Sequence, residues 1–380
     1  MQIPTIKNIK DLKGKRVVLR LDFNVPMKNG KIMETIRIDR ALPTIEYLRK
    51  HQARVVILSH LGSDGSMSLV PVVKYLTKIL HTSIDFVPDF RASSTRTIVD
   101  GLPLGGIVVF ENLRIDPREE KNSATFAKCL ASFGDIYVND AFAVSHRAHA
   151  SIVGITKFMP SYIGLLISDE IKNLSMALKP KHPFLFILGG AKFETKMPLL
   201  KKFSKIAETV FVGGILANDF FRDQGIEVGM SVVDTYKGKL LPLLRKGNIV
   251  LPFDVIAKGG RKSEAKKSDD VFPNESIVDV GPDTIKSLTT IINNAKLIVW
   301  NGPLGFYEEG FDKGTVALMN TIAKSKATSI IGGGDTAVIV EKLGIANKFT
   351  FVSTGGGATL DYLASGTLPG IEAVKNCRKR

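Results

Sequence analysis

Cysteine is almost missing from this sequence, which has only Cys129 and Cys377 in 380 residues. Two cysteines are too few for a disulfide framework or a cysteine-rich metal cluster, so a reducing cytoplasm is the expected location. No apolar run approaches the roughly 18 residues that a membrane helix needs. The first residues mix lysines with apolar side chains and lack the apolar core of a signal peptide. The sequence therefore predicts a cytoplasmic protein that needs no membrane.

Several motifs of familiar enzyme classes are also missing. No G-x-x-x-x-G-K-[ST] segment occurs, which excludes a P-loop kinase, and no H-R-D or D-F-G triplet occurs, which excludes a protein kinase. The G-x-S-x-G nucleophile elbow is absent as well. His146 and His149 have no third ligand nearby in the sequence, so they do not predict a metal site.

Positive charge, by contrast, is abundant. With 52 Lys and Arg against 37 Asp and Glu, the formal net charge is +15. Such a surface can attract nucleic acid, anionic lipid or small phosphorylated substrates. The charge is spread along the chain, with short runs such as Lys201-Lys202, and most lysines are interpreted as solvated surface.

The length and a repeating pattern predict an α/β protein of two domains. A chain of 380 residues exceeds a typical single core. Short apolar β-branched runs alternate with helical patterns, which favours parallel strands buried on both faces in a doubly wound sheet. The runs are Val17–Leu21, Arg54–Leu58, Ile107–Phe110, Ile136–Val138, Phe184–Leu188, Thr209–Val212, Ile249–Leu251, Leu297–Trp300, Thr328–Ile331 and Phe349–Val352.

The residues that follow the runs differ between the two halves. Parallel sheets bind ligands at the carboxyl ends of their strands. First-half runs are followed by Arg, His, Asp and Asn, as in Asp22-Phe23-Asn24 and Glu111-Asn112-Leu113-Arg114, which suit a small, highly charged anion. Second-half runs are followed by glycines that open helices, which suit the phosphates of a nucleotide. The helical pattern through Ile163–Leu178 is the expected connector.

Two glycine segments and two lysines carry most of the expected nucleotide chemistry. Gly332-Gly333-Gly334-Asp335-Thr336 has more glycine than a turn needs, and its carboxylate suits a magnesium ion on the phosphates. Thr354–Gly357 repeats the design one strand later. Lys192 and Lys196 lie after another strand and, if the residues from Phe193 onward are helical, share one face. Either lysine taken alone fits plain surface equally well.

Nine segments together resemble the phosphoglycerate kinase family, in the order in which that family has them and over nearly the whole chain. They are Arg20–Pro26 (RLDFNVP), Ser59–Gly62 (SHLG), Glu111–Arg114 (ENLR), Tyr137–Ser151 (YVNDAFAVSHRAHAS), Gly189–Lys196 (GGAKFETK), Trp300–Gly305 (WNGPLG), Gly332–Thr336 (GGGDT), Ser353–Ala358 (STGGGA) and Leu368–Gly370 (LPG).

The resemblance implies an α/β fold of two Rossmann-like domains with parallel sheets flanked by helices, joined by a helix, with the substrate cleft between them. It implies a 3-phosphoglycerate-binding domain over residues 1–157, a connector over 158–179, a nucleotide-binding domain over 180–360 and a segment, 361–380, that returns to the first domain. The implied reaction is in-line phosphoryl transfer between 1,3-bisphosphoglycerate and ADP, giving 3-phosphoglycerate and ATP, with Mg²⁺ and after hinge closure. The implied protein is a monomer with no need of nucleic acid.

The resemblance also implies roles for individual residues. Arg37 is the central substrate arginine, held with the substrate by Asp22 and Asn24, and Lys192 stabilises the phosphoryl group in flight. The catalytic set is Arg37, Lys192, Gly334 and Gly357. The substrate set adds Arg20, Phe23, His60, Leu61, Gly62, Ser63, Arg114 and Arg147. The nucleotide set is Gly190, Lys192, Lys196, Gly213, Gly214, Asn301, Pro303, Glu308 at the ribose, Gly332, Gly333, Gly334, Asp335, which also binds the metal, and Thr336.

The sequence departs from the family pattern at three places. Ser63 stands where arginine usually follows SHLG, Ile215 replaces a third glycine after Gly213-Gly214, and Ala143–His146 differs from the usual GTAH. Two alternatives stay open at this point. One is a catalytically weak relative that acts as a polyanion-binding protein. The other is a dinucleotide-dependent dehydrogenase, although no acid for a ribose follows Phe349–Val352.

Overall fold

The computed structural model describes residues 3–234 and 238–377, and these form two compact units. The first unit holds the residues up to Lys172 together with those from Thr367 onward, and the second holds Asn173–Gly366. The helix α5 (Leu165–Leu178) runs from one unit into the other. No helix in the described ranges is long and apolar enough to cross a membrane.

The first unit is built on a six-stranded sheet in the order β5-β6-β4-β1-β7-β8, with every neighbouring pair parallel. Its strands are β1 (Arg16–Arg20), β4 (Arg54–Leu58), β5 (Asp85–Val87), β6 (Ile107–Phe110), β7 (Ile136–Asn139) and β8 (Ser161–Ile163). Its helices are α1 (Ile36–Lys50), α2 (Val70–Leu80), α3 (Ser94–Asp100), α4 (Ala124–Ala131) and α13 (Pro369–Cys377), and a small hairpin pairs β2 (Met27–Lys28) with β3 (Lys31–Ile32).

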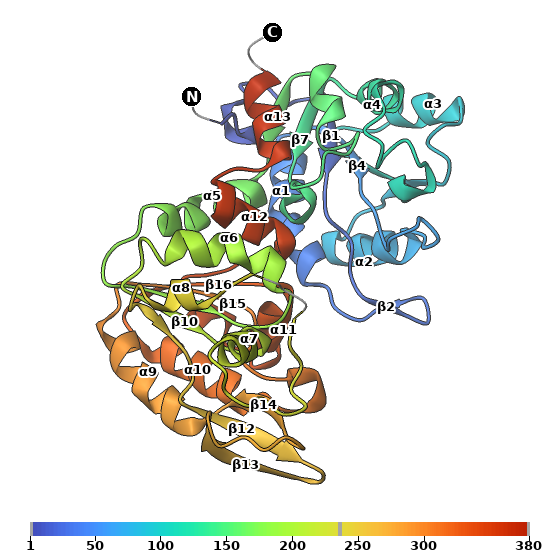
Figure 1. The fold of residues 1–380 in the computed structure, drawn as a ribbon. Coiled ribbons are helices and arrows are strands. Elements are labelled where there is room, and N and C mark those ends of the chain that lie inside the picture. Colours follow the sequence, from blue (N-terminus) through green and yellow to red (C-terminus); the bar gives the residue numbers. More distant parts are fainter. Residues whose placement is uncertain (1–2, 235–237, 378–380) are drawn as a thin grey trace. The chain divides into compact units, whose positions relative to one another are not determined.

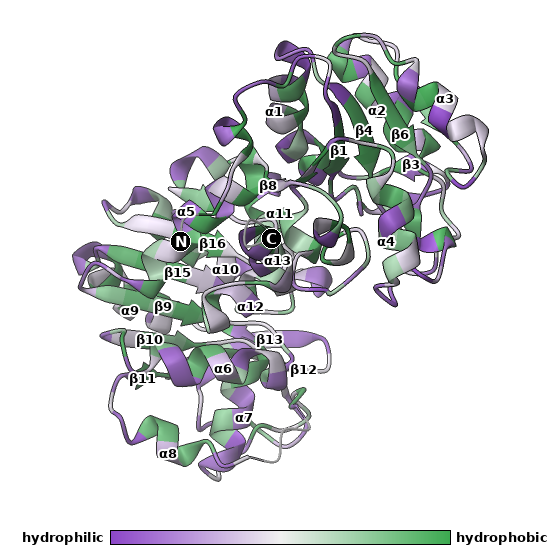
Figure 2. Cartoon of the chain, turned by 90° about the horizontal axis from the view of Figure 1, so that it is seen from above, coloured by the Kyte–Doolittle hydropathy of each residue, from purple (hydrophilic) through white to green (hydrophobic). Residues whose placement is uncertain are grey.

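Both faces of this sheet are buried, as its continuous apolar runs predict. Val17 and Leu19 belong to one core cluster, while Val18 between them belongs to another on the opposite face. Strands β4 and β6 accordingly appear hydrophobic along their length in Figure 2. A sheet covered on both faces leaves its ends as the place for polar chemistry.

The second unit repeats this design with the parallel sheet β11-β10-β9-β15-β16-β17 (Figure 1). Its strands are β9 (Phe184–Leu188), β10 (Thr209–Val212), β11 (Ile249–Val250), β15 (Leu297–Asn301), β16 (Thr328–Gly332) and β17 (Phe351–Val352). The helices are α6 (Phe193–Phe203), α7 (Ile215–Asp223), α8 (Leu241–Leu244), α9 (Pro282–Asn294), α10 (Lys313–Lys324), α11 (Gly334–Lys342) and α12 (Gly357–Ser365).

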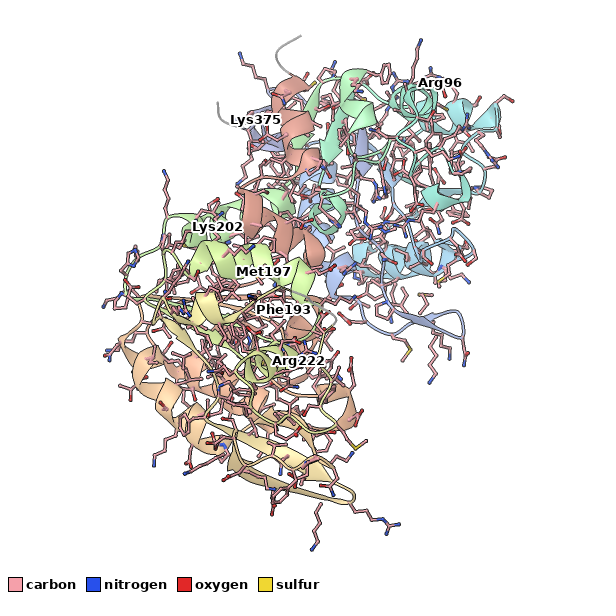
Figure 3. All side chains as sticks on the ribbon, viewed as in Figure 1. Arg96, Phe193, Met197, Lys202, Arg222 and Lys375 are labelled. Carbon is pink, nitrogen blue, oxygen red and sulfur yellow. The ribbon has the colours of Figure 1, made fainter. Side chains whose placement is uncertain are left out.

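Helix α6 is hydrogen-bonded to another helix of the second unit. Phe193 and Met197 on α6 are buried, and Lys202, in the last turn of that helix, donates to the carbonyls of Leu363 and Ala364 at 2.7 and 3.0 Å (Figure 3). Those carbonyls lie in the last turn of α12, where helix carbonyls have no intrahelical partner. The lysine therefore ties two helices of the second unit together.

The structure adds three features to the predicted elements. An antiparallel sheet in the order β13-β12-β14 joins the second unit, from β12 (Asp254–Gly259), β13 (Lys262–Lys267) and β14 (Ser276–Val280). Strands β5 and β8 also lie outside the predicted runs. The predicted connector begins later than expected, because Ile163 ends β8 and α5 starts at Leu165.

Candidate active site

The carboxyl end of the first sheet gathers the predicted arginines. Arg20 is the last residue of β1, and Arg37 lies in the first turn of α1. One guanidinium nitrogen of Arg37, Nη1, donates to Asp22 Oδ2 at 2.9 Å and to the backbone oxygen of Asn24 at 3.1 Å. Asn24 in turn accepts a hydrogen bond from the Gly62 amide at 2.9 Å. The loops after β1 and β4 thus hold Arg37 in one place.

Arg20 lies beneath this group in a buried polar network. Its guanidinium is 1% exposed, donates from Nε to Ser151 Oγ at 2.9 Å and has Nη2 3.2 Å from His60 Nδ1. Ser151 donates from both its amide and its hydroxyl to Glu119, which is also 1% exposed. Burial raises the pKa of Glu119, and the charge of Arg20 opposes that rise. Glu119 and Ser151 were not predicted as site residues: Ser151 ends a segment that resembles the family but had no role assigned to it, and a single Glu in a loop carries no sequence signal.

Two further arginines face the same place. Arg114 donates to the carbonyl of Gly62 and pairs with Glu120 at 3.2 Å, and Arg147 contacts His146 at 3.5 Å between Nε and Nε2. Burial, followed by the charges of Arg20, Arg114, Arg147 and Arg37, holds the pKa of His60 well below its usual range. His60 is therefore neutral near pH 7, and the positive charge of the patch belongs to its arginines.

The remaining predicted substrate residues divide into two kinds. Phe23 and Leu61 have fully buried side chains in the hydrophobic core, so only their backbones can face a ligand. Ser63 is exposed in the loop that follows β4. Within this loop, the Met67 side chain lies 3.3 Å from where a Cβ on Gly62 would be. We name the four arginines, Arg20, Arg37, Arg114 and Arg147, with His60 the arginine patch.

Glycines dominate the carboxyl end of the second sheet because its loops touch. A Cβ on Gly189 would lie 2.3 Å from the backbone oxygen of Pro303, and one on Gly302 would lie 2.3 Å from that of Gly189. Gly302 also has a φ of 91°, which L side chains rarely adopt. Part of the glycine pattern therefore serves close packing of the loops after β9 and β15.

Other glycines of this edge begin helices. Helix α7 follows Gly214, α11 begins at Gly334 and α12 begins at Gly357, so their free amides lie at the strand ends. Asn301, 3% exposed, has a side-chain nitrogen with no hydrogen-bond partner in the described structure, 3.3 Å from where Cβ atoms on Gly332 and Gly333 would be. Free amides and an unpaired amide nitrogen are suited to anionic oxygens.

The two lysines after β9, Lys192 and Lys196, lie in different structural environments. Helix α6 begins at Phe193, so Lys192 precedes it in a left-handed conformation, and the expected shared helical face is wrong. Lys192 is exposed, whereas Lys196 is 7% exposed and donates to the carbonyl of Gly189. Burial lowers the pKa of Lys196 to about 8, although the charge of Asp335 acts in the opposite direction.

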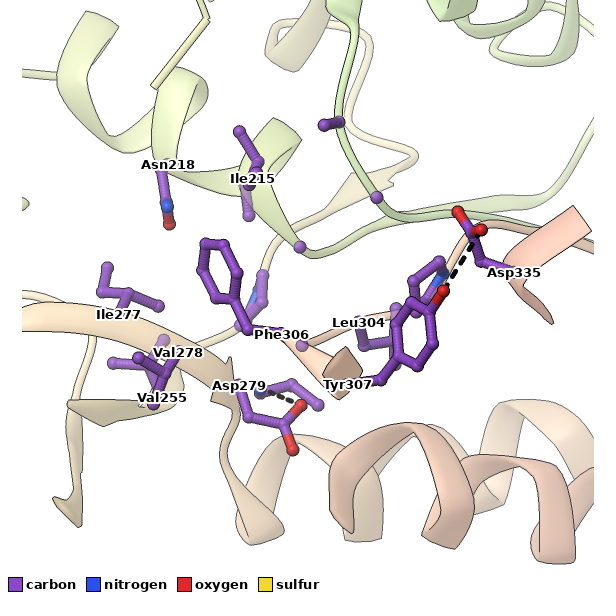
Figure 4. Close-up of a pocket in the computed structure, with 18 of the residues that line it drawn as sticks. Ile215, Asn218, Val255, Ile277, Val278, Asp279, Leu304, Phe306, Tyr307 and Asp335 are labelled. Carbon is purple, nitrogen blue, oxygen red and sulfur yellow. Dashed lines mark hydrogen bonds between the residues drawn. The ribbon is translucent and has the colours of Figure 1, made fainter. Parts of the chain in front are cut away.

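A largely apolar pocket opens beside these loops (Figure 4). Ile215 from the start of α7 and Val255, Ile277 and Val278 from the antiparallel sheet line it, with Leu304 and Phe306 from the loop after β15. Predicted residues that also line it are Gly190, Gly214, Pro303, Glu308 and Asp335. Gly213, Asn301 and Gly332 do not. Ile215 stood out in the sequence as a departure from the family pattern, whereas the other apolar lining side chains were not predicted, because their apolar character does not distinguish them from core.

Asn218 is a polar residue of this lining, besides Asp279, that no sequence pattern singled out. It lies on α7, is 1% exposed and donates to the Val232 carbonyl at 3.0 Å. Its Oδ1 has no hydrogen-bond partner among the described residues, and the amide is directed toward the pocket in Figure 4. A buried free acceptor of this kind can receive a hydrogen bond from a ligand amine.

Asp335 is an exposed carboxylate at the first turn of α11, and it accepts a hydrogen bond from Tyr307 Oη at 3.2 Å. Groups of three or more potential metal ligands are absent from the described ranges. A single carboxylate nevertheless fits Mg²⁺, which keeps its waters and binds through one or two carboxylates and substrate phosphates. Thr336 is buried, and its hydroxyl accepts from the Gly302 amide at 3.0 Å, so it fixes the loop.

Comparisons with known proteins agree across the chain. Residues 6–366 match the family model described as phosphoglycerate kinase. Phosphoglycerate kinases of a Wolbachia endosymbiont of Brugia malayi and of Pseudothermotoga lettingae are each 40% identical over 99% of both chains. The solved structure of phosphoglycerate kinase from Coxiella burnetii is 37% identical with a TM-score of 0.86, and that from Pyrococcus horikoshii is 31% identical with a TM-score of 0.89. Each covers 99% of this chain, and this chain covers at least 99% of each.

Proposed function

Since the chain belongs to the phosphoglycerate kinase family, we propose that its two units divide the family's reaction, the first binding 3-phosphoglycerate and the second the nucleotide. The reaction itself is the glycolytic phosphoryl transfer between 1,3-bisphosphoglycerate and ADP. This membership excludes the dinucleotide-dependent dehydrogenase considered above. We further propose that the protein works as a cytoplasmic monomer and that its units close on each other to bring the two ligands together.

One observation carries the assignment of the first unit: Arg20 lies 3.2 Å from His60, and burial together with the charges of Arg20, Arg114, Arg147 and Arg37 holds the pKa of His60 well below its usual range. Only Asp22 and Glu120 pair with these arginines by direct ion pairs among the described residues. The surplus of positive charge calls for an anion with several acidic oxygens. 3-Phosphoglycerate has a phosphate and a carboxylate. Arg37, oriented by Asp22, is the arginine that we assign to the carboxyl end where transfer takes place.

The pocket and glycine loops support the second assignment. The apolar walls of the pocket suit a flat base, and the free Oδ1 of Asn218 suits the amino group of adenine. The amides at the starts of α11 and α12 and the side chain of Asn301 suit phosphate oxygens. Asp335 would hold Mg²⁺, which supplies charge neutralisation on the phosphates. Lys196 and Lys192 add positive charge beside that place.

Phosphoryl transfer needs positioning and charge stabilisation more than acid–base chemistry. The carboxylate of 3-phosphoglycerate is itself the nucleophile, and it has no proton to lose. The oxygen that attacks, the phosphorus and the leaving oxygen of ADP lie in line, and one P–O bond forms as the other breaks. The chain's task is thus to hold the two ligands, neutralise their charge and exclude water.

We expect Lys192→Ala to lower kcat by roughly 10²-fold, the usual scale for removing one group that stabilises charge in the transition state. A coupled assay of ATP-dependent phosphorylation of 3-phosphoglycerate measures this. Lys201→Ala removes an exposed lysine from α6 in the same unit and should leave kcat unchanged. Full activity in the Lys192 variant would remove it from the catalytic set. Negligible turnover in the unmodified protein would favour the polyanion-binding alternative.

Ser63→Arg should lower KM for 3-phosphoglycerate by roughly fivefold. Ser63 is exposed beside Gly62, whose carbonyl receives Arg114, so an arginine there extends the patch at a position open to solvent. Partly exposed charge pairs contribute about 1 kcal/mol, which sets the size of the effect. KM for ATP should stay the same, and Ser63→Gln tests for a steric effect without charge. An unchanged or higher KM for 3-phosphoglycerate would show that Ser63 does not weaken substrate binding.

A further inference from the structure

The amino end of the second sheet, opposite its nucleotide loops, has an unusual charge. Each of its six strands is entered through a connection from the preceding helix, and each connection contains an exposed lysine. In the order of the strands from β11 to β17, these lysines are Lys246, Lys205, Lys181, Lys296, Lys326 and Lys348. We name this row the lysine edge.

The connections lie side by side because the strands that they enter are neighbours in the sheet. The Lys296 amide donates to the Pro183 carbonyl at 2.8 Å, and the Thr328 amide donates to the Lys296 carbonyl at 3.0 Å. Strands in a sheet lie about 4.8 Å apart, so six neighbouring strands spread their lysines over roughly 24 Å. The edge lies about 16 Å from the carboxyl end, since the central strand β15 has five residues at about 3.3 Å each.

Almost no negative charge accompanies the lysine edge. With Lys179 and Arg245, the six connections contain eight Lys and Arg residues, and Glu208 is their one carboxylate. Glu208 already pairs with His182, 2.7 Å between Oε1 and Nδ1. None of the six lysines forms an ion pair with a carboxylate in the described part of the chain. Lys246 donates a hydrogen bond to Ser204 Oγ at 3.1 Å.

The first unit shows that this fold does not require such a row. Its sheet has the same parallel construction, yet the connections that enter β4, β5, β6 and β7 contain no Lys or Arg, whereas the segment before β1 contains the exposed Lys10, Lys13 and Lys15. At that edge Arg16, the first residue of β1, pairs with Asp100 and Asp135 at 2.8 and 2.7 Å. Cations near helix carboxyl ends can stabilise those helices, and α1, α2 and α4 of the first unit have such cations within their last turns, so this role does not require lysines in the connections.

We propose that the lysine edge binds the phosphodiester backbone of a nucleic acid duplex without sequence preference. A duplex presents about one negative charge per 1.7 Å, so a line of roughly 24 Å can meet every lysine. The sheet twists by about 20° per strand, so the row follows a curved line that suits a helical backbone better than a flat bilayer. Among the described residues, no exposed Phe, Tyr or Trp side chain lies in these connections, and the exposed ring of His182 is paired with Glu208, so the edge offers little platform for stacking unpaired bases.

The experiment measures binding of a fluorescein-labelled 24-base-pair random-sequence DNA duplex by anisotropy, at several salt concentrations. Six phosphate contacts predict a slope of log K against log salt near −5, since each contact contributes about −0.9. The test variant combines K205Q, K296Q, K326Q and K348Q. Its slope should fall to about −2, and its affinity at low salt should fall at least tenfold.

A matched control removes the same charge elsewhere in the second unit. It combines K262Q, K267Q, K286Q and K313Q, four exposed lysines outside these connections. The control should bind the duplex within twofold of the unmodified protein, and both variants should keep the kinase activity. Equal losses in both variants would show that net charge alone attracts the duplex and would overturn the proposal. So would weak binding by the unmodified protein, or edge-dependent binding to vesicles with anionic lipid but not to the duplex.

Discussion

Replacing Arg37 by alanine should lower kcat by roughly 10²- to 10³-fold, the range found when one charge-stabilising group is removed from an active site. Arg37 is fixed by two hydrogen bonds from Nη1, to Asp22 and to the Asn24 carbonyl. This orientation exists before any ligand binds, so the charge needs little reorganisation during transfer. The coupled assay with 3-phosphoglycerate and ATP measures kcat, and KM for ATP should change little because the nucleotide is assigned to the other unit.

Two variants make the Arg37 result interpretable. Arg91→Ala removes an exposed arginine of the same unit, paired only with Asp89 in a surface ion pair at 2.8 Å, and should leave kcat unchanged. Arg37→Lys keeps the charge without the planar guanidinium, so it should recover only part of the rate. A kcat within threefold of the unmodified enzyme in Arg37→Ala would contradict its place in the catalytic set.

Replacing Glu119 by alanine should lower the free energy of unfolding by about 3 kcal/mol or more. Glu119 accepts two hydrogen bonds from Ser151, and Ser151 receives one from Arg20. All three residues are at most 1% exposed, so the variant leaves a buried guanidinium and a buried serine short of partners. Breaking a buried charged network by removing one member costs about 3–5 kcal/mol. Urea unfolding followed by circular dichroism gives the change.

The comparison for Glu119 is Asp89→Ala, which breaks the exposed pair with Arg91 and should change the unfolding midpoint little. Glu119→Gln keeps an acceptor for Ser151 and should fall between the two. Enzyme kinetics distinguish a positioning role of Glu119 from a purely structural one. The folded Glu119→Ala protein should have a raised KM for 3-phosphoglycerate, because Arg20 and, next to it, His60 are no longer held in place. Equal unfolding midpoints for the Glu119 and Asp89 variants would show that the network does not support the arginine patch.

Much of the fold could be predicted because its strands are buried on both faces. Runs such as Arg54–Leu58 and Phe184–Leu188 are apolar at nearly every position, and they coincide with β4 and β9. The strand β13 could not be predicted in this way. Its sequence, KSEAKK, is exposed and charged, and it pairs only along one edge with β12. This segment is a strand because it pairs with β12, and a local sequence pattern cannot reveal that pairing.

The candidate site likewise contains some residues that sequence patterns predict and others that they do not. Asp22, His60 and Arg114 follow strands directly, so topology alone predicts that they gather at one edge. Glu119 and Ser151 reach the site from loops far from strand ends, and their role depends on being buried together. The apolar pocket side chains, such as Val255 and Ile277, belong to the antiparallel sheet and could not be distinguished from core. Lys196 differs from surface lysines only through its burial.

The most direct measurement of the central claim is a crystal structure of the protein with 3-phosphoglycerate and the Mg²⁺ complex of a non-transferable ATP analogue. We expect the phosphoglycerate on the arginine patch, with oxygens within hydrogen-bond distance of Arg37 and Arg114. We also expect the base in the pocket beside Asn218, and the phosphates at the amides of α11 and α12 with Asp335 near the metal. Phosphoglycerate bound in the second unit, or a nucleotide bound on the arginine patch, would contradict the claim.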